Sequence, residues 1–583
     1  MEYLDFLILR DLEFSDIIFS DAVRNERIKE LENVGYLKNG KLTELSKKTL
    51  SEYKVDNAII LAAGLSSRFA PLSYEKPKGL TTVRGEILIE RQIRQLHEVG
   101  ISDITVVVGY KAEEFEYLKE KYSIEIVKNI EYASRNNHAS LFLVADRLKN
   151  TYICSSDNYF EENPFHSYEW MAGYSTQYIS GPTEEWCIKT DENRNISGIQ
   201  VGGSDAWIMI GPAYFDRKFS EKFKKILYKE YPLETTKDKL WETLYVEHIS
   251  ELPMRANYVN PPIIKEFDYI DEAIAFDPHL LDHVDSGIID RIVKTLGCCR
   301  TEIHELYPLK AGLTNLSCHF RVGDQEYVYR HPGIGTELLV DRTAEFQALD
   351  LAKRIGIDKT FLAGDPTEGW KISYYIKNSR QLDVFDAHQR KLALQKLRSL
   401  HENKGTLGRK FSFLDEAKRY EKQFKPDYLS NISGYYELRN KIAKLEKLDP
   451  QKGLKHCITH NDFFPLNILV AEEQEMHLID WEYAGMGDYA NDYGTFVVTS
   501  RLDDELAEQA LIEYFDRSPT WNEKVHNAIY VAYASWCWYL WTLLKEMEGD
   551  CVGDWREVYR KYALHYCQKI EGLFKEKNEI WFI

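Results

Sequence analysis

Residues 61–80, LAAGLSSRFAPLSYEKPKGL, decide the fold prediction for the first half of this 583-residue chain. They follow the apolar run NAIILA (57–62) and precede the helical pattern ILIERQIRQLHEVG (87–100). Apolar runs and helical patterns then alternate through ITVVVG (104–109), AEEFEYLKEKY (112–122) and IEIV (124–127). This alternation is typical of βαβ units, so we predict an α/β domain with a mostly parallel sheet.

The loop after the first strand has the composition of a phosphate-binding site. Leu61, Ala63 and Gly64 end the strand in small residues, which lets backbone N–H groups approach a triphosphate closely. Arg68 adds a guanidinium fork that matches phosphate geometry, and Lys78, held by the preceding proline, adds a point charge. A small-residue loop alone is a weak signal, but with the arginine and the downstream Pro-Lys it predicts nucleotide binding.

These motifs resemble the signature of sugar-phosphate and choline-phosphate nucleotidyltransferases, most closely the bacterial CTP:phosphocholine cytidylyltransferases, over about residues 55–278. The resemblance implies a Rossmann-like nucleotidyltransferase fold, with CTP as co-substrate. It further implies that Arg68 and Lys78 are catalytic, and that Leu61, Ala63, Gly64, Asn137 and Ser140 (the last two in NNHAS) bind the nucleotide.

The same resemblance implies a Mg²⁺ site built from two carboxylates. Asp157 in SSDNYF matches the first family ligand and Asp268 in EFDYIDEA matches the second, although Glu266 and Asp271 lie close enough in sequence to compete for that assignment. Magnesium, arginine and lysine would neutralise the charge that gathers when a phosphate attacks the α-phosphate. Trp186 and Trp241 are candidate walls for a quaternary ammonium group, although each taken alone is more readily explained as a core residue.

A second motif, in ITHNDFFPLNILV (458–470) and HLIDWEYA (477–484), is typical of phosphoryl transfer. Asp462 fits a base that accepts the proton of the substrate hydroxyl, while Asn467 and Asp480 fit Mg²⁺ ligands. Apolar β-type runs flank both segments. We therefore predict a catalytic loop followed by a metal-binding turn.

Upstream residues supply the rest of a kinase-type site. Thr314 and Asn315 can donate hydrogen bonds to the phosphates of ATP; Arg330 occupies the position where protein kinases carry a lysine, and Glu345 on the next predicted helix is its expected ion-pair partner. Gly323-Asp324 predicts a hairpin between two strands in this region. The arginine, with no D-F-G or A-P-E motif, argues against a protein kinase.

The arginine and a late W-x-x-W pair resemble choline and ethanolamine kinases over about residues 312–567. This resemblance implies an α+β, protein-kinase-like fold. It also implies that Trp538, Trp541 and Tyr483 wall the pocket for the ammonium group, although an aromatic core stripe would give the same spacing.

The first 54 residues form a separate block of short amphipathic segments whose order predicts a winged helix-turn-helix-like module. Its 11 acidic and 9 basic residues argue against DNA binding, as does the net charge of −19 for the whole chain, so nucleic acid is an unlikely partner. The predicted domains are therefore residues 1–54, 55–285 and 286–583.

Composition indicates a reduced, cytoplasmic protein. Nine cysteines form no C-x-x-C pair, and no signal peptide is visible at the N-terminus. Residues 528–544 are uncharged, but 17 residues rich in tryptophan and tyrosine suit a buried helix better than a membrane span. Oligomerisation is left open.

Together the two sites predict a bifunctional enzyme. Its C-terminal domain would use ATP to phosphorylate choline, and its N-terminal domain would use CTP to convert phosphocholine to CDP-choline, which the family resemblance implies is used in cell-surface decoration. Three alternatives are the same chemistry on ethanolamine, an aminoglycoside phosphotransferase, and a winged-helix regulator with degenerate enzyme domains. The intact charged residues of both motifs argue against degeneracy.

Overall fold

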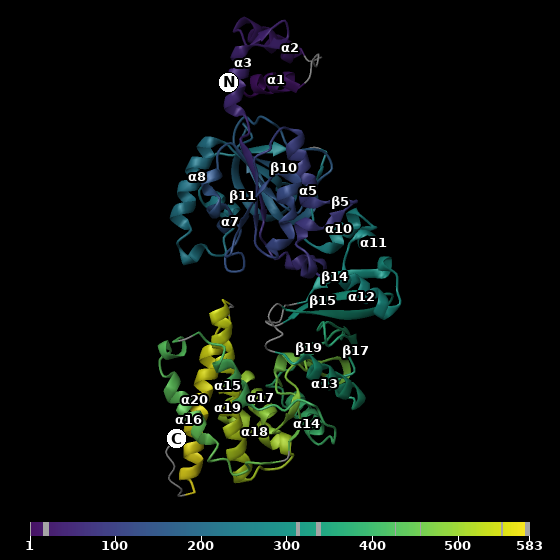
Figure 1. Ribbon diagram of the computed structural model, residues 1–583, viewed down its shortest axis with the longest axis vertical. Coiled ribbons are helices and arrows are strands. Elements are labelled where there is room, and N and C mark those ends of the chain that lie inside the picture. The colour runs from purple at the N-terminus through teal and green to yellow at the C-terminus, as the bar shows by residue number, and fades with distance from the viewer. Residues whose placement is uncertain are drawn as a thin grey trace. The chain divides into compact units, whose positions relative to one another are not determined.

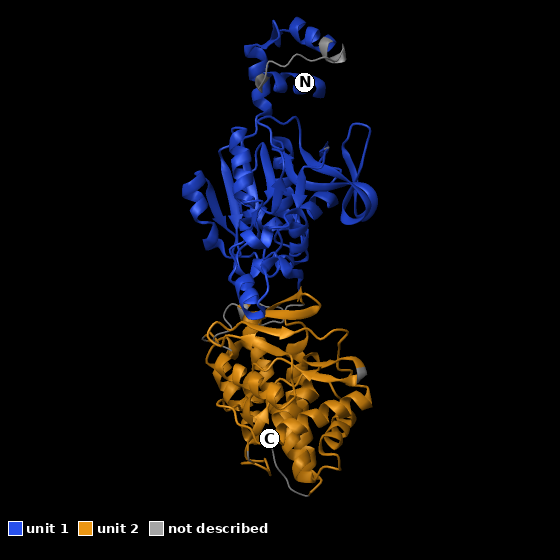
Figure 2. Cartoon of the chain, turned by 90° about the vertical axis from the view of Figure 1, so that its right-hand side faces the viewer, with its two compact units in different colours: residues 1–308 blue, residues 309–583 orange. Residues whose placement is uncertain are grey.

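The computed structural model describes residues 2–14, 22–259, 261–309, 315–333, 340–425, 427–454, 456–549 and 552–577. The chain divides into two compact units, residues 1–308 and 309–583 (Figure 2). Each unit is described by itself below. The predicted division into three domains stays a prediction.

The N-terminal segment of unit 1 contains helices and a short hairpin around their own core. Its elements are α1 (Tyr3–Phe14), α2 (Ala22–Asn33), β1 (Leu37–Lys38), β2 (Lys41–Leu42) and α3 (Glu44–Leu50). Asn39 and Gly40 join the two strands with φ values of 53° and 73°, and a type I′ turn requires both to be positive. Phe6, Ile8 and Leu9 of α1 are buried. The winged-helix assignment of this segment stays a prediction.

A seven-stranded sheet forms the centre of unit 1, in the order β12-β10-β11-β8-β3-β6-β7. Two of its strands, β10 and β11, are labelled in Figure 1. Its strands are β3 (Asn57–Ala62), β6 (Ile104–Val108), β7 (Glu125–Lys128), β8 (Thr151–Ser155), β10 (Gly173–Thr190), β11 (Ile196–Phe215) and β12 (Arg255–Tyr258). Only the pairs β10–β11 and β11–β8 are antiparallel. The mostly parallel α/β sheet predicted from the sequence is confirmed.

The central strands are buried on both faces, which is why they are continuous apolar runs. Ile59 and Val107 belong to the core on one face, and Ile60 and Val106 to the core on the other. The helices of unit 1 after α3 are α4 (Leu72–Glu75), α5 (Leu88–Glu98), α6 (Tyr117–Tyr122), α7 (His138–Leu143), α8 (Arg217–Glu230), α9 (Trp241–Glu247), α10 (Ile270–Phe276), α11 (Leu280–His283) and α12 (Gly287–Leu296). Its short strands are β4 (Thr82–Val83), β5 (Glu86–Ile87), β9 (Asn158–Phe160), β13 (Ile264–Glu266) and β14 (Ile303–Pro308).

Unit 2 begins with an antiparallel sheet and continues as a helical lobe, the α+β, kinase-like arrangement that was predicted. Its strands are β15 (Asn315–Val322), β16 (Gln325–Pro332), β17 (Phe361–Gly364), β18 (Lys371–Tyr374), β19 (Arg380–Gln381), β20 (Cys457–Thr459), β21 (Ile468–Val470), β22 (Met476–Leu478) and β23 (Gly485–Gly487). The predicted hairpin at Gly323-Asp324 is confirmed, because Val322 pairs with Gln325. The apolar runs on either side of the phosphoryl-transfer motif form β21 and β22, which pair with each other.

The helices of unit 2 are α13 (Arg342–Arg354), α14 (Ala387–His401), α15 (Phe413–Glu421), α16 (Tyr435–Leu445), α17 (Ala490–Thr499), α18 (Asp504–Phe515), α19 (Trp521–Glu548) and α20 (Trp555–Lys575). The uncharged stretch 528–544 lies within α19, whose side chains pack in the main core of this unit. None of the helices described is sufficiently long and apolar to cross a bilayer.

His526 on α19 predicts how the stability of this lobe depends on pH. Its ring nitrogens lie 2.8 Å from Asp449 and 2.9 Å from Asp488. Burial opposes the charged ring, but the two carboxylates outweigh it and raise the pKa of His526 to about 9. The stabilisation is therefore complete below the ordinary histidine pKa of about 6.5, and is lost as the pH rises through about 9.

We expect the free energy of unfolding to fall over that pH interval in urea titrations of the full chain. His526→Gln should remove this part of the pH dependence. An unchanged pH dependence in the variant would contradict the assignment to His526.

Candidate active sites

A cavity of about 320 Å³ lies in unit 1 at the carboxyl ends of β3 and β8. This edge of a parallel sheet is where α/β folds place their ligands. The sequence-predicted residues that line it are Leu61, Ala63, Gly64, Arg68, Lys78, Asn137, Ser140 and Asp157. Segments more than 90 residues apart in the sequence thus meet around one hollow.

Lys78 contacts Asp157, and the backbone next to it, at Gly79, lies close to Ser156. Its ammonium group donates to Asp157 at 2.8 Å, and its side chain is only 5% exposed. A Cβ atom on the next residue, Gly79, would lie 2.8 Å from the side chain of Ser156. Glycine is therefore needed for the Lys78 loop to pack against the end of β8.

Acidic side chains gather beside this lysine. Arg68 pairs with Asp268 at 2.8 Å. Glu266 lies opposite Asn158, the residue after Asp157, in the pairing of β13 with β9. Burial, with the negative charges of Asp157 and Asp268, raises the pKa of Glu266. The structure therefore brings Glu266, a sequence neighbour of Asp268, close to Asp157.

The carboxylates of Asp157, Glu266 and Asp268 offer hard oxygen donors, which Mg²⁺ prefers. The Oδ1 atom of Asp157 is buried and has no hydrogen-bond partner among the described residues, so one carboxylate oxygen is left for a ligand. Whether these residues hold magnesium stays part of the proposal below.

Two predicted nucleotide contacts lie on the far wall of the cavity. The Asn137 carbonyl accepts from the backbone N–H of Trp241 at 2.7 Å, and its amide donates to Glu242 at 3.2 Å. Ser140 accepts from Asn129 at 3.1 Å. These contacts fix both side chains next to the cavity in one orientation.

The two tryptophans predicted to grip an ammonium group do not line this cavity. Trp241 is 2% exposed and packs among Tyr174, Phe215 and Phe223. Trp186 is half-buried against the same core. The placement of Trp241 therefore supports the core role that the sequence had left open.

In unit 2 the predicted catalytic loop and metal-binding turn converge. Asn467 donates its amide N–H to the Asp462 carboxylate at 2.8 Å, which leaves its carbonyl oxygen for a metal ion. Burial and the negative charge of Asp480 raise the pKa of Asp462 to about 8. Asp462 therefore lies beside both metal-ligand candidates, where a base for the substrate hydroxyl is needed.

The Arg330–Glu345 ion pair predicted from the sequence is present at 2.6 Å. Arg330 also lies 3.0 Å from Glu482 and 3.7 Å from Asp480. Burial disfavours a charged Glu345, yet its cationic neighbours, Arg330 foremost, hold its pKa well below the ordinary value. The charged cluster is thus pre-formed beside the metal-binding turn.

Sequence reasoning missed three members of this cluster. Arg342 contacts both Glu345 and Glu482, at 2.9 Å and 3.0 Å, and Lys371 donates to Glu345 at 3.2 Å. Oxygen atoms of Glu345, Asp480 and Glu482 lie within 4.8 Å of one another, a spacing that suits a cation. The W-E pair directly after Asp480 is a local signal that could have identified Glu482.

A cavity of about 310 Å³ lies next to this cluster, between the sheet and the metal-binding turn. Its walls include Asn315, Arg330, Lys371 and Asp480. Asn315 also accepts from Arg342 at 3.1 Å and donates to Glu482. Thr314, predicted with Asn315 to contact the phosphates, lies outside the described residues.

Asp492 positions the catalytic loop and was also missed. Its fully buried carboxylate accepts the backbone N–H groups of His460 and Asn461, the former at 2.9 Å, and lies 2.9 Å from His401 Nε2. The loop therefore has a defined shape immediately before Asp462. Nothing in the local spacing around Asp492 signals this role.

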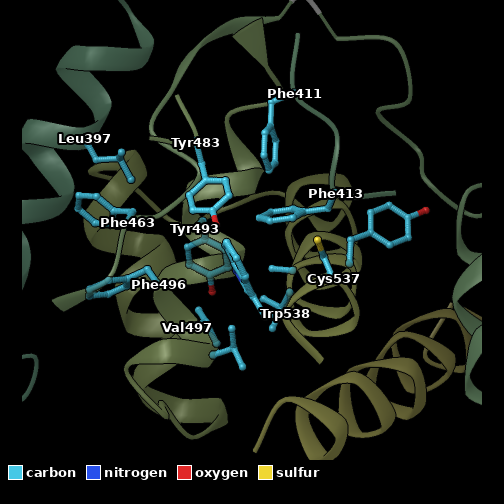
Figure 3. Packing of buried hydrophobic residues seen from close by; sticks show 14 of the residues in the cluster. Leu397, Phe411, Phe413, Phe463, Tyr483, Tyr493, Phe496, Val497, Cys537 and Trp538 are labelled. Carbon is cyan, nitrogen blue, oxygen red and sulfur yellow. The ribbon is translucent and has the colours of Figure 1, made fainter. Parts of the chain in front are cut away.

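An aromatic cluster lies beside the same loop. Figure 3 shows Tyr483 and Phe413 facing Trp538, with ring centroids 5.2 Å and 6.1 Å from it. Burial, with Asp462 among the smaller causes, raises the pKa of Tyr483 well above its ordinary value. Trp541 lies 6.3 Å from Trp538, and neither indole N–H has a partner among the described residues. The three predicted wall residues are thus together, close to Asp462. Tyr483 and Trp538 are also buried in the main core of unit 2, and none of the three lines the cavity beside Asp480, so their role as pocket walls stays a prediction.

Comparison with known families assigns the two halves to different kinds of transferase. Residues 58–158 match the family model described as MobA-like NTP transferase domain, and residues 305–523 match the phosphotransferase enzyme family. These matches cover the first cavity's phosphate loop and the second site's catalytic loop, respectively.

Individual relatives also match one half or the other. Choline-phosphate cytidylyltransferase of Streptococcus pneumoniae is 35% identical over 37% of this chain and 94% of its own length. 2-Aminoethylphosphonate cytidylyltransferase of Lancefieldella rimae is 35% identical over 38% of this chain and 92% of its own. The structure of choline kinase LicA from Streptococcus pneumoniae is 27% identical and covers 48% of this chain and 98% of that one, with a TM-score of 0.43.

Proposed function

The N-terminal half of this chain belongs to the family of bacterial cytidylyltransferases that includes choline-phosphate cytidylyltransferase, and from that premise we propose that the whole chain makes CDP-choline from choline in two consecutive steps. Unit 2 transfers the γ-phosphoryl group of ATP to choline. Unit 1 then transfers a cytidylyl group from CTP to phosphocholine and releases pyrophosphate. The later use of CDP-choline in surface decoration stays a prediction.

The observation that carries this proposal is the presence in one chain of two charged sites whose reactions are consecutive. Lys78 and Asp157 meet in the first site, and Asp462 and Asn467 meet in the second. The product expected from the second site is the substrate expected at the first. A degenerate regulator would have no reason to keep both sets of contacts.

In the kinase reaction, Asp462 accepts the proton of the choline hydroxyl as its oxygen attacks the γ-phosphorus of ATP. Asn467 and Asp480 would hold Mg²⁺, which supplies positive charge to the phosphate oxygens when bound. Arg330 and Lys371 line the cavity beside the metal-binding turn, where they would contact the phosphate oxygens of ATP. Tyr483, Trp538 and Trp541 present aromatic faces to the trimethylammonium group.

In the cytidylyl transfer, a phosphate oxygen of phosphocholine attacks the α-phosphorus of CTP and pyrophosphate leaves. A phosphomonoester is already ionised near neutral pH, so no general base is required. Lys78 and Arg68 neutralise charge on the reacting phosphates. Asp157, Glu266 and Asp268 would hold Mg²⁺, which supplies the same neutralisation when bound.

A second candidate substrate is ethanolamine. The relative named for 2-aminoethylphosphonate, a compound with a primary amine, is as similar to this chain as the one named for choline phosphate. The test is to incubate the purified protein with ATP, CTP and Mg²⁺ and either amino alcohol, and to identify products by mass. We expect phosphocholine and CDP-choline from choline; turnover of ethanolamine alone would replace this proposal by the second.

Trp538 provides a test of the ammonium pocket. We expect Trp538→Ala to raise the KM for choline about tenfold, with little change in the KM for ATP, because a cation–π contact contributes up to about 2 kcal/mol. Steady-state kinetics with each substrate varied would measure both. Trp536→Ala is the matched control, since Trp536 lies on the same helix but packs against Tyr435. An unchanged choline KM in Trp538→Ala would assign that residue to the core.

A further inference from the structure

A second cavity in unit 1, of about 360 Å³, shares no lining residue with the nucleotidyl-transfer cavity. Its walls come from α1 and from strands β8, β10, β11 and β12. We infer that this cavity is a separate binding site for a small phosphate-bearing molecule, held by Arg255 beneath helix α1.

The cavity lies over a row of residues on one face of the sheet that includes a glycine. Strand register places Tyr152, Tyr214, Gly173 and Arg255 next to one another across four strands. A Cβ atom at Gly173 would lie 2.6 Å from the amide nitrogen of Asn257. The row therefore has no side chain between Tyr214 and Arg255, and α1 contributes Tyr3, Leu7 and Arg10 to the cavity walls.

Arg255 is the reason to expect an anion. The residue is 8% exposed, and the Nη1 atom of its guanidinium is buried without a hydrogen-bond partner among the described residues. Its contacts there are aromatic, with Tyr3 at 3.5 Å and Trp170 at 5.6 Å from the ring centroids. A buried charge without a counter-charge is costly, by several kcal/mol, and an anion in the adjoining cavity would relieve that cost.

The other polar groups around the cavity also favour an anion. Arg194 lines it without an ion pair among the described residues, and Arg10 lines it while pairing with Asp11 at 3.1 Å. The one carboxylate in the wall, Glu169, accepts from the Tyr152 hydroxyl at 2.6 Å. The Tyr214 hydroxyl is buried and has no partner among the residues that the structure describes. The lining side chains thus include three arginines and one carboxylate.

A phosphate group suits these donors because arginine forks bind its oxygens in pairs. The volume is within the usual range for small-molecule pockets, which begins at about 300 Å³. Since Tyr3 and Arg10 belong to α1, a bound ligand would fasten the N-terminal segment to the sheet. This gives the first helix a ligand-sensing role that is independent of either transferase reaction.

Hydrogen–deuterium exchange of the full-length protein tests the inference. The probes are inorganic phosphate and, separately, phosphocholine, added to the Lys78→Ala variant so that binding in the first cavity is weakened. We expect either probe to slow amide exchange in residues 3–14 and 255–258. Protection by inorganic phosphate would show that the phosphate group is sufficient for binding. Protection by phosphocholine but not by inorganic phosphate would show that the head group is also needed.

Arg255→Gln in the same background should raise the half-saturating concentration of the effective probe by about tenfold or more, because charge-assisted hydrogen bonds are lost. Arg217→Ala is the control, as Arg217 is an exposed arginine of the same unit that pairs with Asp56. If Arg255→Gln does not fold, Arg194→Ala at the exposed rim replaces it, with a weaker but measurable loss. No protection by either probe, or equal protection in the folded variant, would overturn the inference.

Discussion

Asp462→Asn is expected to abolish ATP-dependent phosphorylation of choline while CTP-dependent conversion of supplied phosphocholine continues at the normal rate. A general base contributes about 10²- to 10⁴-fold to a rate, so kcat of the kinase reaction should fall by that factor. Asparagine has nearly the same size as aspartate. Its side-chain oxygen can still accept the hydrogen bond that Asn467 donates to Asp462 at 2.8 Å. What it loses is the ability to accept the proton of the hydroxyl.

The measurement is a pair of separate assays, one that follows phosphocholine formed from choline and ATP, and one that follows pyrophosphate formed from phosphocholine and CTP. Asp449→Asn is the matched control, because it makes the same change at another buried aspartate of unit 2, whose contact is His526 at 2.8 Å. Asp449→Asn should lower the free energy of unfolding without lowering kcat of the kinase reaction. Loss of both activities in a folded Asp462→Asn protein would contradict two independent sites.

The fold was predictable from sequence because its strands are unusually clear. Residues 57–62 and 104–108 form fully buried parallel strands, and such strands are continuous apolar runs. The Gly323-Asp324 pair likewise predicted the hairpin between β15 and β16. Strands β12 and β13 were not individually predicted, since they are short segments in a stretch where the alternation of patterns decays.

The candidate sites were predictable where their residues follow strands. Lys78 and Asp157 could be expected near each other because the carboxyl ends of β3 and β8 lie at the same edge of the sheet. Arg342 and Asp492 could not, since their roles depend on contacts between segments remote in sequence. Trp241 shows a second limit of prediction from sequence. A tryptophan that packs in a core and one that lines a pocket give the same sequence pattern.

Lys78→Ala should produce the reverse phenotype, a protein that accumulates phosphocholine when given choline, ATP and CTP. Lys78 is nearly fully buried and its ammonium group contacts Asp157 at 2.8 Å. Removing one positive donor from a site where negative charge develops costs about 10²- to 10³-fold in rate. The loss should appear in kcat for pyrophosphate release, with the kinase reaction unchanged.

The chain offers a close control two residues away. Lys76 is partly exposed and pairs with the exposed Asp285 at 2.8 Å, outside the first cavity. Lys76→Ala makes the same substitution in the same loop, so cytidylyl transfer should remain close to that of the unmodified protein. Lys78→Arg keeps the positive charge at the site, and partial recovery of kcat in that variant would separate the effect of charge from that of packing. If Lys78→Ala and Lys76→Ala were equally active, the positive charge buried beside Asp157 would have no part in the reaction, and the assignment of the first cavity as the transfer site would fail.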